Sequence, residues 1–161
     1  MKDAHDKPLR QQLIDLLAGG SAHAKFDDIV KGLPPELRGT RPAKFPHSPW
    51  MLLEHMRRAQ WDILEFSRNS NYVSPEWPEG YWPKAEGPPN SAAWNRTIEE
   101  FRRDLKAMQN LVANSKTDLF ARISWGDGQT ILREALLLTD HNAYHLGQFV
   151  DLRRLLGAWK G

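Results

Sequence analysis

Residues 131–156 read ILREALLLTDHNAYHLGQFVDLRRLL, and their pattern sets the expected fold class. Apolar positions recur in steps of three and four, the repeat of one helix face turned toward a core. The stripe comprises Ile131, Ala135, Leu138, Asn142, His145, Phe149, Leu152 and Leu156. Gly126 and Gly128 precede the stretch, and Gly157 follows it where helices commonly end. The pattern predicts one long helix that faces inward.

Three further segments carry the same repeat. The stripes are Leu52, Met56, Ala59, Ile63 and Phe66; Trp94, Ile98, Phe101, Leu105, Met108 and Val112; and, after Pro8, Leu9, Leu13 and Leu16. Gly19-Gly20 interrupts the earliest helix, and Ser21 is expected to cap a continuation through Phe26, Ile29 and Val30. Ser48-Pro49 is typical of a helix start. The sequence predicts an all-α, antiparallel four-helix bundle in one domain, residues 1–161.

Two connections between these helices are unusually long and rich in proline. Residues 32–49 hold five prolines, and residues 69–90 hold five prolines together with Tyr72, Trp77, Tyr81 and Trp82. Long loops in compact domains are often functional. The second loop either packs its aromatic rings on the bundle or forms a wall over the mouth of a site or a dimer contact.

The composition limits the possible functions. The 161 residues are 40% hydrophobic and 26% charged, with a net charge of +2 and no cysteine. Disulfides, zinc–cysteine sites and cysteine nucleophiles are therefore excluded. The interspersed charges do not form a nucleic-acid footprint, so no nucleic acid is expected as partner. The absence of an apolar run of membrane-spanning length, and of a signal peptide, predicts a cytoplasmic protein without a membrane partner.

His141 and His145 are the strongest candidates for chemistry. Four residues are just over one helical turn, so both rings leave the same helix face about 6 Å apart along the axis. His55 lies at the inner edge of the stripe over residues 52–66. Three imidazoles pointing inward from two helices can bind one metal ion and leave room for water or substrate. The alternative is three hydrogen-bonded core histidines, because a spacing of four is a weak motif by itself.

Other polar residues rank below these three. His23 is a candidate fourth ligand or supporting group, with a packed core histidine as its alternative. Glu134 lies one heptad before His141, and Asp62 lies one heptad after His55. Each acid could orient a histidine or act as a base, although each is about 10 Å of helix away and could serve in a salt bridge instead. Gln148 and Tyr144 are expected to line the pocket.

Two segments carry a resemblance to a known family. Residues 48–56, SPWMLLEHM, and residues 140–148, DHNAYHLGQ, resemble the DinB-like superfamily of four-helix bundles, which includes thiol-dependent S-transferases and mycothiol-dependent maleylpyruvate isomerases. The resemblance covers nearly the whole chain. It implies that His55, His141 and His145 are the metal ligands. It also implies a homodimer and a divalent metal, commonly zinc or nickel.

Three functions follow as hypotheses. The first is a metal-dependent enzyme acting on a small molecule, of the thiol-dependent S-transferase type, with a low-molecular-weight thiol as cosubstrate. The second is a metal-dependent hydrolase, which needs a nearby general base from Asp62, Glu134 or His23. The third is a non-catalytic dimeric bundle in which the metal or the histidine cluster is structural or sensory.

Overall fold

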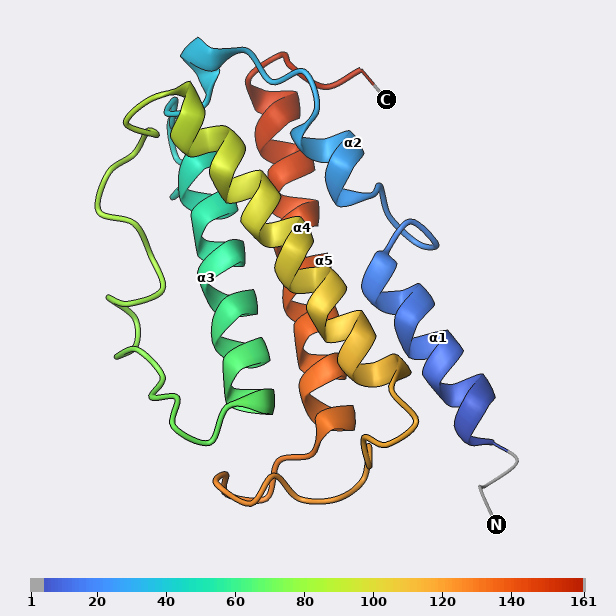
Figure 1. Cartoon of the computed structure of the whole chain (residues 1–161). Coiled ribbons are helices and arrows are strands. Elements are labelled where there is room, and N and C mark those ends of the chain that lie inside the picture. The colour runs from blue at the N-terminus through green and yellow to red at the C-terminus, as the bar shows by residue number, and fades with distance from the viewer. Residues whose placement is uncertain (1–4, 161) are drawn as a thin grey trace.

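The computed structural model describes residues 5–160, which fold into an elongated bundle of helices (Figure 1). The elements are α1 (Asp6–Ala18), α2 (Phe26–Val30), the 3-10 turn η1 (Pro35–Leu37), α3 (Pro49–Arg68), α4 (Ser91–Ala113) and α5 (Ile131–Leu155). The all-α prediction is confirmed. In the described part of the chain, no helix combines the length and the apolar character needed to cross a membrane.

The three longest helices begin at side chains that cap them. Each cap accepts a hydrogen bond from a backbone N–H three residues further on, one of the groups without a partner inside the helix. The caps are Ser48 for α3, Asn90 for α4 and Thr130 for α5. The predicted Ser48 cap is confirmed. Gly157, at φ +67°, lies just past α5 in the left-handed conformation that favours glycine.

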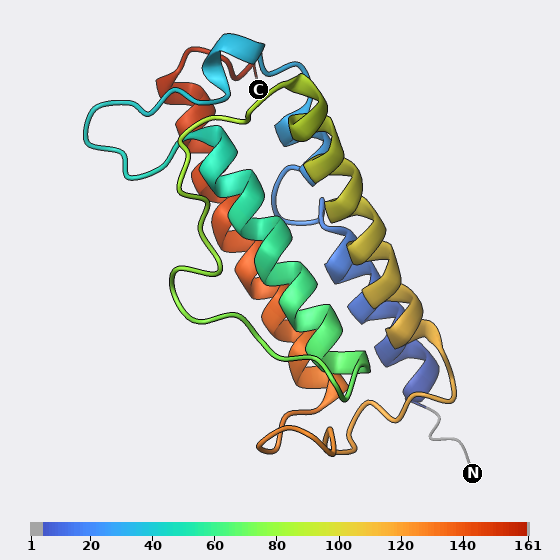
Figure 2. The same ribbon diagram turned by 60° about the vertical axis from the view of Figure 1, so that its left-hand side comes forward.

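The helix directions differ in part from the prediction. Glu54 is hydrogen-bonded to Thr97 and Gln60 to Phe101, so positions on α3 and α4 advance together and these two helices run in the same direction. α5 runs opposite to both (Figure 1). The connection over residues 69–90 is long enough to return along the outside of α3 before α4 begins, as Figure 2 shows. The antiparallel arrangement is therefore not confirmed for the α3–α4 pair.

The beginning of the chain shows two further differences. α1 ends at Ala18 because Gly19 adopts a φ of +69°. α2 then begins at Phe26 after Lys25, so the expected cap at Ser21 is wrong. On α1 the apolar face uses Leu17, which is 6% exposed, and leaves Leu16 46% exposed. Positions 13 and 17 are one turn apart, and this face is the one that packs on the bundle.

The core follows the remaining stripes. On α5 the predicted positions from Ile131 to Leu152 are all buried, and the apolar ones belong to two clusters shared with α3 and α4. The more N-terminal part of α3 contributes Leu52 and Met56 to one cluster, and the later part contributes Ile63 and Leu64 to the other. α3 and α5 are thereby held side by side, which fixes the spacing between any side chains that project from both.

A buried arginine ties α1 to the end of α4. The guanidinium of Arg10 donates to the carbonyl oxygens of Val112, Asn114 and Thr117 at 2.6, 3.0 and 2.7 Å. Carbonyls in the last turn of a helix have no partner within the helix, so the arginine supplies their missing donors. Arg10 therefore stabilises both the contact between the two helices and the terminus itself.

Candidate metal centre

Three histidines converge between α3 and α5. Nε2 of His55 lies 3.1 Å from Nε2 of His145 and 3.1 Å from Nε2 of His141. His55 and His145 are buried, and His141 is half-buried. The two α5 histidines leave one helix face because they are four residues apart, and His55 meets them from the neighbouring helix. The sequence-based prediction that these three side chains lie together is confirmed.

The outer ring nitrogens fix where the protons are. Nδ1 of His55 lies 3.1 Å from the carbonyl oxygen of Tyr81, which can only accept, so this nitrogen carries the proton. Nδ1 of His145 donates in the same way to Oε1 of Gln148 at 2.7 Å. Both Nε2 atoms therefore present a lone pair. Two lone pairs that face each other at 3.1 Å repel unless a cation lies between them.

Burial keeps the three rings in the form that binds metals. It lowers the pKa of His55 to about 3 and the pKa of His141 to about 4. It also lowers the pKa of His145. All three imidazoles are therefore neutral at pH 7, and neutral imidazole is the ligand form.

The donor set fits a single metal ion. The ligand nitrogens of the three histidines all lie within 4.8 Å of one another. Two imidazole nitrogens bound tetrahedrally to one zinc at about 2.0–2.1 Å lie roughly 3.3 Å apart, close to the observed 3.1 Å. His55, His141 and His145 can therefore hold a divalent metal. Imidazole suits zinc, nickel, copper and iron alike, so the ligand set leaves the choice among them open.

A cavity of about 530 Å³ opens beside the cluster. Both long connections contribute to its wall. The ring of Trp82 lies between two imidazoles, 3.7 Å from the centroid of His55 and 4.1 Å from that of His47, and nearly parallel to both. The other lining residues are Ala59, Asp62, Ile63, Trp77, Tyr81, Leu137, Tyr144 and Gln148, with His141 and His145. Both alternatives for the 69–90 loop hold in part, because Trp77, Tyr81 and Trp82 line this cavity and Trp82 also packs against the core.

The comparison with protein families agrees with this geometry. A family model described as the DinB superfamily matches residues 18–149, a range that contains all three histidines and most of the bundle. The chain belongs to the DinB superfamily. No curated protein and no solved structure matches it. Membership together with the histidine cluster identifies this DinB-superfamily chain as one suited to metal binding.

Of the lower-ranked candidates, Asp62 lies in this pocket, whereas Glu134 and His23 lie outside it. Asp62 lines the pocket and accepts a hydrogen bond from the hydroxyl of Tyr81 at 2.8 Å. Glu134 is buried outside the pocket and pairs with Arg133 at 2.7 Å. His23 also lies outside it, with Nδ1 2.9 Å from the carbonyl oxygen of Ala24. Of the three, only Asp62 is placed to influence a ligand beside the histidines.

The sequence of this DinB-superfamily chain did not lead us to expect two groups at the site. They are His47 and the backbone carbonyl of Tyr81 in the 69–90 loop. His47 lines the pocket, and its Nδ1 is buried without a hydrogen-bond partner. Burial, followed by the influence of His145, lowers its pKa. A signal was present, because His47 directly precedes the Ser48 cap and so lies about two helical turns before His55. The carbonyl of Tyr81 gives no such signal, since any residue could supply it.

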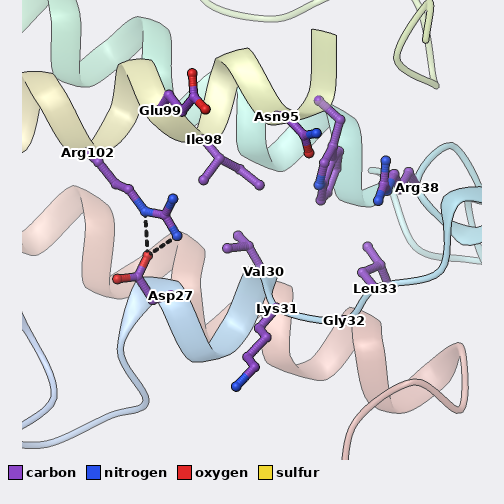
Figure 3. A pocket seen from close by; sticks show the side chains of 11 residues that line it. Asp27, Val30, Lys31, Gly32, Leu33, Arg38, Asn95, Ile98, Glu99 and Arg102 are labelled. Carbon is purple, nitrogen blue, oxygen red and sulfur yellow. Dashed lines mark hydrogen bonds and ion pairs between the residues drawn. The ribbon is translucent and has the colours of Figure 1, made fainter. Parts of the chain in front are cut away.

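A second cavity of similar size, about 450 Å³, lies between α2 and α4 (Figure 3). Arg102 spans it to Asp27 at 2.7 Å, and the guanidinium of Arg38 lies 4.9 Å from the ring centroid of Trp94. No histidine lines this cavity, and its arginine–aspartate pair is exposed. The chemistry available to the DinB-superfamily chain is therefore concentrated at the three-histidine cluster.

Proposed function

We propose that this chain is a metal-dependent enzyme that acts on a small molecule, of the thiol-dependent S-transferase type. The observation that carries the proposal is the pair of unprotonated Nε2 atoms on His55 and His145, held 3.1 Å apart at the edge of an open cavity. A purely structural site needs no adjoining cavity, whereas a catalytic site keeps a position for a reactant. We expect zinc or nickel as the metal and a cytoplasmic homodimer as the working form.

The chemistry requires a thiolate. A bound divalent cation lowers the pKa of a thiol whose sulfur coordinates it. The sulfur lone pair then forms a bond to an electrophilic carbon of the acceptor, and the bond from that carbon to its leaving group breaks. Neutral His47 is the acceptor for the thiol proton, because its buried Nδ1 has no other partner and it lines the same cavity.

The protein residues around the ligands serve to orient them. The Tyr81 carbonyl and the Gln148 amide hold the His55 and His145 rings, each through Nδ1. The hydroxyl of Tyr144 in turn accepts from the amide nitrogen of Gln148 at 3.1 Å. Such partners fix the tautomer and direction of a ligating imidazole, and their loss typically costs about 10–100-fold in metal affinity.

A metal-dependent hydrolase is the second candidate, and the position of His47 favours it. Hydrolysis at a metal needs a base within reach of water in the pocket. His47 and Asp62 both line that pocket, whereas Glu134 and His23 do not.

The test begins with metal content. Untagged wild-type protein, the His55→Ala variant and the His23→Ala variant are dialysed with Zn²⁺ or Ni²⁺, and bound metal is measured by elemental analysis. About one metal per chain is expected in the wild type and in His23→Ala, and none in His55→Ala. A wild-type chain without metal, or a folded His55→Ala chain that keeps it, would overturn the proposal.

Activity separates the two reactions. The metal-loaded protein is incubated with cysteine or glutathione and an electrophilic aryl halide, and thiol consumption is followed alongside hydrolysis of a panel of aryl esters. Thiol transfer that disappears in His55→Ala supports the transferase, and ester hydrolysis without any thiol supports the hydrolase. Failure of both reactions with every thiol and ester would favour a non-catalytic metal site.

A further inference from the structure

The histidine pocket contains one carboxylate that no cation neutralises. Oδ2 of Asp62 accepts the Tyr81 hydroxyl proton at 2.8 Å, and Oδ1 is buried without a hydrogen-bond partner. Within residues 5–160, no lysine or arginine forms an ion pair with Asp62. Burial, the charge of Asp62 and a hydrogen bond with Asp62 raise the pKa of Tyr72 to about 12. Asp62 is thus the one carboxylate among the residues that line the pocket, while the metal proposed at the histidines would bring positive charge to the same pocket.

The two arginines near this wall are already paired. Arg58 donates to the carbonyl oxygens of Gly80 and Trp82, and it forms an ion pair with Glu54 at 3.0 Å. The charge of Arg41 contributes to the lowered pKa of His47, and Arg41 forms an ion pair with Glu86 at 2.9 Å. Neither arginine offsets the charge of Asp62. Asp62 therefore remains available as the counter-charge for a positively charged group of a ligand.

Two aromatic rings form a corner in front of the carboxylate. The centroids of Trp77 and Tyr81 are 5.4 Å apart and their planes are inclined at 53°. Trp77 is 69% exposed at the pocket, whereas both faces of Trp82 are covered by imidazoles. The hydroxyl of Tyr81 donates to Asp62 and also has a hydrogen bond with Ser74, so the ring is held against the carboxylate. Electron-rich rings with a carboxylate behind them attract ammonium groups.

We propose that the pocket binds a substrate with an apolar body and an ammonium group, the latter held by Trp77 and Tyr81 with Asp62 as the counter-charge. Asp62 is seven residues beyond His55 on α3, about 10 Å along the helix axis. The ring centroid of Trp77 is closer, at 6.5 Å from that of His55. The ammonium end therefore binds between these two distances from the histidines, which leaves the other end of the substrate beside them. This inference rests on the proposed function in one respect, because it treats the histidine pocket as the substrate pocket.

Quaternary ammonium probes test the inference, since they have no lone pair and cannot coordinate a metal. Binding of phenethyltrimethylammonium is compared with that of its neutral isostere, (3,3-dimethylbutyl)benzene, by tryptophan fluorescence on zinc-loaded wild-type protein. About tenfold tighter binding of the cation is expected. Asp62→Asn should abolish that preference, while Asp15→Asn, which removes an exposed carboxylate on α1, should leave it unchanged.

A second variant guards against misfolding of Asp62→Asn. Trp77 is exposed, so Trp77→Leu leaves the core intact and should weaken cation binding several-fold. Equal affinities for cation and isostere in the wild type, or an undiminished preference in both variants, would overturn the inference. Metal is measured on the same samples. Metal without a cation preference refutes this inference alone, and cation binding by a chain that takes up no metal refutes the proposed function alone.

Discussion

The metal-free protein should lose stability in mild acid because its histidines are buried as neutral rings. The pKa of His55 is lowered by burial to about 3, against an ordinary value of 6.5. Between these two values the unfolded chain binds a proton that the folded chain does not. Folding stability is therefore fully present above pH 6.5 and falls as the pH falls toward 3.

The size of the effect follows from the same two pKa values. Between pH 7.5 and pH 5.0, His55 alone removes roughly 2 kcal/mol of unfolding free energy, at about 1.4 kcal/mol per pH unit. His141, with a pKa lowered to about 4, removes a similar amount over this range. His55→Gln has no proton to bind, so its stability should fall by about 2 kcal/mol less than that of the wild type.

Urea unfolding followed by far-UV circular dichroism measures this difference. Wild type, His55→Gln and the control His23→Gln are unfolded in the presence of a chelator at pH 7.5, 6.0 and 5.0. Groups distant from the substituted residue contribute equally to all three proteins and cancel when the losses are compared. The reasoning is refuted if wild type and His55→Gln lose the same free energy on acidification, because His55 would then titrate alike in the folded and unfolded states.

Four further substitutions test the scaffold by urea unfolding. Arg10→Met should destabilise the protein by about 2–4 kcal/mol, because it leaves three carbonyls at the end of α4 without donors; a loss below about 1 kcal/mol would show that water replaces the arginine. Leu17→Ala should cost about 2–4 kcal/mol and Leu16→Ala less than about 0.5 kcal/mol, and equal costs would contradict the assigned helix face. Burial raises the pKa of Asp104, so stability should decline as the pH rises above the ordinary aspartate pKa, and Asp104→Asn should decline less. Parallel pH profiles for Asp104→Asn and wild type would contradict this last expectation.

Much of the fold could be predicted from periodicity, because burial on one face leaves a direct trace in the sequence. The stripes over α3, α4 and α5 were recognisable for this reason, and so were His145 within the last stripe and His141 one turn before it. Helix direction leaves no such trace. An apolar stripe has the same spacing in either helix direction, so it does not show whether two helices are parallel or antiparallel. Only the length of the 69–90 connection was compatible with α4 beginning beside the start of α3.

The ligand residues of the candidate site could be predicted from the sequence, because their side-chain types and spacing indicate metal binding. The residues that surround them could not, because they are brought there by tertiary contacts. His55 was identified by its place on an apolar face, but its neighbours in space come from loops that have no periodicity. The stacking of Trp82 between His47 and His55 depends on how two proline-rich connections fold back. The choice of Leu17 over Leu16 likewise depends on the packing partner, because both positions continue a helical stripe from Leu13.

Tyr81 contacts both the proposed metal ligand His55 and the pocket carboxylate Asp62. Its carbonyl oxygen holds the ring of His55, while its hydroxyl holds Asp62. A ligand that orders this residue from the aromatic side also restricts the imidazole on the metal side, and the reverse is equally true. Thermodynamic linkage makes the two effects equal in free energy. The factor by which bound metal changes the ligand affinity equals the factor by which bound ligand changes the metal affinity. If the pocket binds a metal and a substrate as proposed, this single loop residue would link occupancy of the pocket to retention of the ion.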